Sequence, residues 1–141
     1  MKIKSILVAL SAVMTLCVTA CSSNCDKPLV DTQWHLVELN SQTVALPDDT
    51  FNLIFSKDLS IGGVAACNRL LGNYSVSENN SLKFATIGTT MMLCPEFGEL
   101  ENVFTVSLGS VAGYKISGDT LTLSDGNGKT VAIFTALAPE K

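Results

Sequence analysis

The sequence predicts a mainly β domain, a small antiparallel β-barrel of about eight strands with one inserted α-helix near residues 95–111. Short segments of alternating apolar and polar residues recur along the chain, and turn-forming residues separate them. Only one segment, late in the chain, has the spacing of an amphipathic helix. Because successive strands lack intervening helices, a parallel α/β sheet is excluded. A β-sandwich is the alternative architecture.

The N-terminus has the pattern of a bacterial lipoprotein signal. Lys2 and Lys4 precede an apolar run that is too short to span a membrane. The run ends in Val-Thr-Ala-Cys at residues 18–21, a sequence that a lipoprotein signal peptidase would cut just before Cys21. Acyl chains on Cys21 would then anchor the protein stably to a membrane. The alternative is an ordinary cleaved signal with a chance cysteine at the cut site.

This pattern divides the chain into a signal peptide at 1–20, a lipidated N-terminus with a tether at 21–30, and one domain at 31–138. Ser22 follows the lipidation site, where an aspartate would favour inner-membrane retention. We therefore expect a lipid anchor in the outer membrane of a bacterium, facing the periplasm. With 9 Lys and Arg against 13 Asp and Glu, the net charge is −4, which argues against nucleic acid as a partner.

The first strand is expected at residues 33–39, where Trp34 is large enough to plug one end of a core. His35 is expected to be an exposed strand residue. Residues 40–49 contain a proline and two adjacent aspartates, which indicate a loop.

Residues 51–55 and 59–61 are predicted to form a hairpin. Gly62 and Gly63 interrupt its second strand and indicate a bulge, a bend or a close approach of two backbones. Further strands are expected at residues 74–76, 82–84, 114–116, 121–123 and 130–134.

The predicted helix has one apolar face. Its residues recur three or four positions apart, at Phe97, Leu100, Phe104, Leu108 and Val111. Pro95 suits the first helical position, because its missing N–H has no partner there. We expect this face to close the interior of the barrel as part of its core.

Three cysteines remain after Cys17 leaves with the signal and Cys21 takes the lipid. In an oxidising compartment we expect a Cys67–Cys94 disulfide, because Cys25 lies in the tether. Cys25 would then be free or paired between molecules. The alternative is a bridge from Cys25 to one of the other two, which would fasten the tether to the barrel.

The sequence does not indicate an enzyme, a metal site or a cofactor. It has a single histidine and no two-residue cysteine spacing, which argues against a metal centre. It lacks a nucleophile elbow and a phosphate loop, and adjacent Asp48 and Asp49 would diverge in an extended chain. Residues 125–128 superficially resemble the start of a calcium loop, but Lys129 and Ala136 occupy ligand positions, so a turn is expected.

Several motifs resemble the META/HslJ family of small bacterial envelope proteins. The matching positions are Trp34, Gly63, Cys67, Asn68, Gly72, Tyr74, Thr90, Met92 and Cys94. Ala66 departs from the pattern, since the family usually has glycine there, which puts the local backbone geometry in question. The resemblance implies a calycin-like β-barrel with a helix. It also implies no established catalytic activity, and the namesake of the family is heat-inducible.

These observations together predict a non-catalytic envelope lipoprotein with a binding or structural role on the periplasmic face, in heat, envelope or antibiotic stress. Its partner would be another envelope protein or an apolar small molecule. The alternative is an inhibitor of lysozymes or proteases, or a pilotin-like secretion accessory protein. An exposed loop able to enter an active site would favour the inhibitor.

Overall fold

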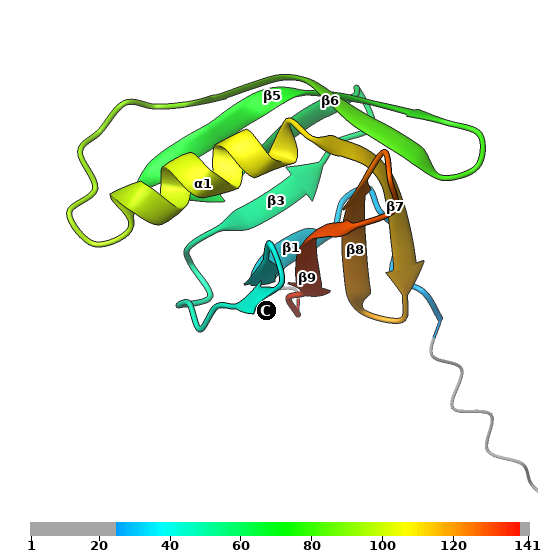
Figure 1. Cartoon of the computed structure of the whole chain (residues 1–141), viewed down its shortest axis with the longest axis horizontal. Coiled ribbons are helices and arrows are strands. Elements are labelled where there is room, and N and C mark those ends of the chain that lie inside the picture. Colours follow the sequence, from blue (N-terminus) through cyan, green and yellow to red (C-terminus); the bar gives the residue numbers. More distant parts are fainter. Residues whose placement is uncertain (1–24, 139–141) are drawn as a thin grey trace, which may run out of the picture.

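A computed structural model describes residues 25–138 and confirms the predicted fold class. Nine antiparallel strands form one ring-like sheet in the order β2-β1-β3-β4-β5-β6-β7-β8-β9, and a β1–β9 pairing closes it (Figure 1). The ninth strand beyond the expected eight is a two-residue segment in the predicted 40–49 loop. The elements are β1 Gln33–Leu39, β2 Gln42–Thr43, β3 Asn52–Phe55, β4 Ser60–Ala65, β5 Asn68–Ser77, β6 Ser81–Thr89, α1 Gly98–Leu108, β7 Val111–Ser117, β8 Thr120–Asp125 and β9 Thr130–Ala136.

The ring has one weak junction, between β6 and β7. These two strands share a single residue pair, Ser81 with Gly113, whereas β5 and β6 pair along most of their length. The helix connects β6 to β7 and packs against β4, β6 and β9. It thereby supplies apolar side chains to the interior of the ring. Figure 1 shows α1 beside the β5–β6 hairpin.

The helix is shorter than predicted at both ends. Pro95 lies in a turn before α1, and Phe97 has a non-helical φ of −128°, so the helix begins at Gly98. The preceding residue Cys94 is bonded to Cys67 in the β4–β5 turn, which fixes where the chain can enter the helix. Val111 was assigned to the helical face, but it is the first residue of β7 and pairs with Asp125 of β8.

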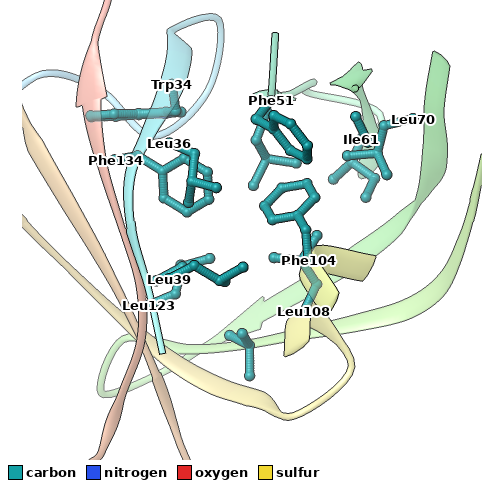
Figure 2. Close-up of a cluster of buried hydrophobic side chains, with 14 of the residues drawn as sticks. Trp34, Leu36, Leu39, Phe51, Ile61, Leu70, Phe104, Leu108, Leu123 and Phe134 are labelled. Carbon is teal, nitrogen blue, oxygen red and sulfur yellow. The ribbon is translucent and has the colours of Figure 1, made fainter. Parts of the chain in front are cut away.

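The helical face is part of the core, as expected. Phe104 and Leu108 are fully buried, and the Phe104 ring lies edge-on to Phe51 at 5.5 Å and to Phe134 at 6.2 Å between centroids. Figure 2 shows these rings facing one another across the interior, with Trp34 at one end of the cluster. Aromatic and aliphatic side chains from opposite walls thus meet inside the ring.

His35 is buried, with 5 % of its surface exposed, so the expectation of an exposed residue was wrong. Its Nδ1 lies 3.1 Å from Oδ1 of Asn52 on the neighbouring strand. The Nδ2 of Asn52 donates in turn to the backbone oxygen of Asp48 at 2.8 Å. His35 therefore contacts the residue opposite it on β3, a partner that the pattern of a single strand does not reveal.

Two family glycines stand where backbones approach closely. A Cβ on Gly63 would overlap the carbonyl oxygen of Asn52, and a Cβ on Gly72 would overlap that of Thr86. Gly63 also has a φ of +136°, which side-chain-bearing residues rarely adopt. Close approach is therefore the reason for glycine at position 63 in β4 and at position 72 in β5. The neighbouring Gly62 has open space at the same position.

Residues 26–30, assigned to the tether, are attached to the sheet. The backbone N–H of Lys27 donates to the Gly118 carbonyl oxygen. The backbone N–H of Gly118 donates in turn to the Asp26 carboxylate at 2.7 Å. The indole N–H of Trp34 donates to the Leu29 carbonyl at 3.1 Å. The expected signal peptide and Cys21 lie outside the described residues. Within residues 25–138, no helix combines the length and hydrophobicity that crossing a bilayer requires.

Candidate binding loop at the disulfide

The connection from β6 to α1 presents large apolar side chains to solvent. It leaves the body of the molecule at the left of Figure 1, in yellow-green. Met91 is 99 % exposed, Met92 58 % and Leu93 92 %, whereas Cys94 is buried. Single exposed apolar residues are ordinary, whereas three in succession on a projecting loop are typical of surfaces that bind a partner. We call residues 90–93 the MML loop.

A disulfide holds the C-terminal end of the MML loop. Cys94 is bonded to Cys67, as predicted, with 5.7 Å between their Cα atoms. Cys67 also donates its backbone N–H to Sγ of Cys94 at 3.2 Å. Cys25 is exposed and forms no disulfide within the described part of the chain. The segment ending at Cys94 therefore comes back against the β4–β5 turn, in agreement with the sequence analysis.

The side chain of Asn68 holds the middle of the MML loop. Asn68 is 2 % exposed, and both polar atoms of its side-chain amide form hydrogen bonds with Met92. Oδ1 accepts from the Met92 N–H at 2.8 Å, and Nδ2 donates to the Met92 carbonyl at 3.0 Å. An amide side chain thus takes the place of a neighbouring strand at this residue.

The same amide reaches the helix. Nδ2 of Asn68 lies 2.9 and 3.1 Å from the two carboxylate oxygens of Glu101 and 3.2 Å from Sγ of Cys94. Two N–H protons are therefore distributed among the Met92 carbonyl, the Glu101 carboxylate and the sulfur. Hydrogen bonds to a carboxylate are stronger than neutral ones, so Glu101 fixes the orientation of the amide.

Thr90 holds the N-terminal end of the MML loop. Its hydroxyl donates to Oδ1 of Asn68 and accepts from the backbone N–H of Arg69, both at 2.9 Å. Its own N–H donates to the Arg69 carbonyl at 3.1 Å, which extends the β5–β6 pairing by one residue. The loop is consequently fixed at its start, middle and end, while three side chains remain free.

A hollow of about 450 Å³ lies between the MML loop and α1. The side facing the loop includes Met92 and Cys94, and the side facing the helix includes Glu101 and Thr105. Asn68 forms part of its lining. A partner that covers the loop would therefore also meet the acidic first turn of the helix.

The remaining family residues support the sheet. Trp34 is fully buried, and Tyr74 packs edge-on against Phe55 at 4.9 Å between ring centroids. The Tyr74 hydroxyl donates to the Ser56 carbonyl at 2.9 Å. Burial raises the pKa of Tyr74, and the negative charge of Asp58 raises it further. Hydrogen bonds from Ser60 lower the pKa of Asp58.

Ala66 has a left-handed backbone, with a φ of +58°, in the turn that presents Cys67. This is the position where the family usually has glycine, which adopts such a φ without strain. The departure noted in the sequence therefore falls at a residue where glycine is conformationally favoured. The turn nevertheless brings Cys67 to its partner.

Other candidate chemistry does not come together. No group of three or more His, Cys, Asp or Glu side chains within residues 25–138 is placed to hold a metal ion. The carboxylate of Asp125 accepts backbone N–H groups from Asn127 and Lys129, as expected for a turn.

Replacing Asn68 by aspartate is expected to lower the free energy of unfolding by about 2 kcal/mol, because the Met92 carbonyl loses its donor and a second carboxylate faces Glu101. Chemical denaturation of both proteins measures the change. Glu101→Gln serves as the control, since it keeps an acceptor and removes the charge. The double substitution should recover part of the loss. Equal stability of Asn68→Asp and the native protein would contradict the role assigned to the amide.

The sequence analysis identified Cys67, Asn68, Thr90, Met92 and Cys94 through the family motif, and the structure brings all five together. It missed Glu101 as their partner, and it missed the exposure of the apolar residues. The only local signal was three successive apolar residues between a strand and Pro95, where neither strand nor helix spacing continues. That signal does not distinguish a buried segment from an exposed one.

Known proteins share this fold. A protein from Burkholderia xenovorans solved by NMR is similar with a TM-score of 0.60 and 26% identity, over 78% of this chain and 84% of that one. Another NMR structure is similar with a TM-score of 0.56 and 24% identity, over 74% of this chain and 88% of that one. The crystal structure of a DUF4847 family protein from Bacteroides vulgatus ATCC 8482 is similar with a TM-score of 0.57 and 15% identity, over 76% of this chain and 93% of that one.

No curated protein matches the chain. The META domain matches residues 27–137, which include every strand of the ring and the helix. The same range contains the disulfide and the Asn68 contacts that hold the MML loop. This protein therefore belongs to the META domain family.

Proposed function

We propose that this protein is a non-catalytic binding lipoprotein of the bacterial envelope, and that it contacts another envelope protein through the MML loop. One observation carries the proposal. Met91, Met92 and Leu93 are exposed on a loop that a disulfide and a buried amide hold in place.

The geometry of the loop favours binding over a purely structural role. A loop that is already ordered loses little conformational entropy on association, so more of the contact energy remains as affinity. Each large apolar side chain that a partner buries fully contributes about 1.5–3 kcal/mol. Met91 and Leu93 are the residues with most surface left to bury.

The acidic side chain beside the loop indicates that the partner carries basic residues around its binding pocket. Glu101 lies at the hollow beside the loop, whereas the exposed Glu96 and Glu99 line a separate hollow between α1 and the end of β1. An apolar pocket with a basic rim would complement this surface and would accelerate association. The acidic net charge of −4 acts in the same direction.

The envelope location rests on two features. The residues before Cys21 match a lipoprotein cleavage site, and the Cys67–Cys94 disulfide is of the kind that persists in oxidising compartments. A role in heat, envelope or antibiotic stress is part of the proposal and follows from the family resemblance. Neither lipid nor stress is needed for the loop geometry itself.

Affinity capture from envelope membranes tests the function. The lipidated protein serves as bait beside two variants, Met91→Ser with Leu93→Ser, and Val103→Ser with Val106→Ser. The second pair removes exposed apolar residues from α1, which are 40 % and 69 % exposed, and is the matched control. We expect a captured protein to be lost only with the loop variant, while both variants melt like the native protein. Equal capture by all three would refute the proposal.

Substitution of Cys21 by serine is expected to leave the protein uncleaved or soluble in the periplasm, because no thiol remains to accept diacylglycerol. Incorporation of labelled palmitate, followed by membrane fractionation, measures this. Cys25→Ser should retain the lipid and is the control. Palmitate on the Cys21→Ser protein would show that the anchor lies elsewhere.

A further inference from the structure

The backbone of the MML loop exposes hydrogen-bonding groups on one side only. The chain runs from Thr90 to Cys94 without a turn or bend. The N–H and C=O of Met92 are both bound by Asn68. Those of Met91 and Leu93 form no hydrogen bond within residues 25–138. In an extended chain, alternate residues direct their backbone groups to the same side, so Met91 and Leu93 offer an unpaired edge.

The side chains show the same alternation. Met91 and Leu93 are almost fully exposed, whereas Met92 is only partly so. A partner that pairs with this edge as an added strand would therefore receive both free backbone groups and both free side chains. Proteases bind substrates in this way, with the residue before the cut entering a specificity pocket.

We propose that the MML loop binds the active site of a serine endopeptidase with an apolar specificity pocket, as a substrate-like inhibitor that places Leu93 in that pocket. This inference rests on the proposed function, since it identifies the class of partner that the same loop binds. Leu93 is assigned to the pocket because its side chain is exposed and its N–H is free. Met91, two residues earlier, supplies the second free N–H and C=O.

The bond that such an enzyme would attack is held on both sides. Residues before it are fixed by β6 and by the Asn68 contacts with Met92, and Cys94 after it is fixed by the disulfide. Attack of the serine Oγ on the Leu93 carbonyl carbon forms an ester and breaks the bond to the Cys94 nitrogen, which takes the proton.

The new amine of Cys94 cannot diffuse away, because the disulfide keeps it beside the ester. The reverse attack of this amine on the ester re-forms the peptide bond and returns the proton to the serine. Return is therefore faster than hydrolysis, and the enzyme remains occupied. A flexible loop of the same sequence would release the amine and be cut as a substrate.

Steady-state inhibition of α-chymotrypsin by the complete mature protein tests the inference, because that enzyme has a hydrophobic specificity slot. We expect an inhibition constant at or below about 1 µM, typical of the weaker end of such complexes. Leu93→Lys should weaken this inhibition at least about 30-fold, the effect of losing a central contact residue, and should create inhibition of trypsin. Val106→Lys, at an exposed position of α1, should neither weaken the inhibition of chymotrypsin nor create inhibition of trypsin.

Rapid cleavage after Leu93, or no inhibition of either protease by the native protein and Leu93→Lys, would overturn the inference. Both variants alter exposed residues, and their melting temperatures verify that they fold. If the capture experiment still depends on the MML loop in that case, the proposed function stands and only the partner class is wrong. If the loop variant also captures the same proteins as the native protein, both the inference and the proposed function are wrong.

Discussion

Replacing Phe104 by alanine is expected to lower the free energy of unfolding by about 3–5 kcal/mol, the usual cost of removing a buried aromatic ring. Phe104 is fully buried against Phe51, just before β3, and Phe134 of β9, the two strands that flank β1 (Figure 2). Its loss removes two edge-to-face contacts and leaves a cavity that a closed sheet cannot easily fill. The denaturant midpoint measures the change, and the whole domain should unfold in one transition.

Val106→Ala on the same helix is the control for Phe104→Ala. Its side chain is 69 % exposed, so it changes helix composition without removing core. We expect an effect within about 0.5 kcal/mol. If Phe104→Ala leaves the midpoint unchanged, the helix is a lid and not part of the core, and the space beneath it becomes the place to search for a ligand.

Replacing Gly63 by alanine is expected to cost about 4 kcal/mol. The added methyl group would overlap the Asn52 carbonyl oxygen, and the φ of +136° is unfavourable for alanine. Overpacking and backbone strain each contribute about 1–3 kcal/mol. The strands cannot separate to relieve the overlap, because Gly63 and Leu53 are paired in the β3–β4 ladder. Asn52 is also held by its hydrogen bond with His35.

Gly62→Ala is the matched control, since it changes the neighbouring residue of the same strand. A Cβ there meets nothing within 4 Å. We expect stability to be unchanged or raised by up to about 1 kcal/mol, because alanine restricts the unfolded chain more than glycine. Denaturation curves of the two variants are compared directly. Similar curves would show that the close approach at Gly63 does not constrain the sheet.

The sequence predicted most of the strands because alternation is a local property of the chain. The hairpin between β3 and β4 and the three strands after the helix appear where turn residues separate apolar runs. Pairing of Cys67 with Cys94 was also predictable, since the third cysteine lies near the N-terminal end of the domain. The glycines in β4 indicated an irregular strand, but a bulge, a bend and a close approach of two backbones all remained possible. The position of the Asn52 carbonyl beside Gly63 shows that the cause is close approach.

The ends of the helix were not predictable from its apolar spacing. That spacing continues from Phe97 to Val111, but the disulfide at Cys94 determines how the chain enters α1, and pairing with β8 takes Val111 into β7. Both constraints come from residues distant in the sequence. His35 was misjudged for the same kind of reason, because its partner Asn52 lies 17 positions away and faces it only when β1 and β3 pair.

The sequence by itself therefore determined the fold class, the cysteine pair and the group of motif residues, because each follows from local periodicity or from a shared family pattern. Only the tertiary structure decided what those residues do. Asn68 and Glu101 lie 33 positions apart, and their contact appears when α1 packs beside β5. The exposure of Met91 and Leu93 is likewise set by what surrounds them, since three apolar residues in a row are as compatible with a core as with a binding loop.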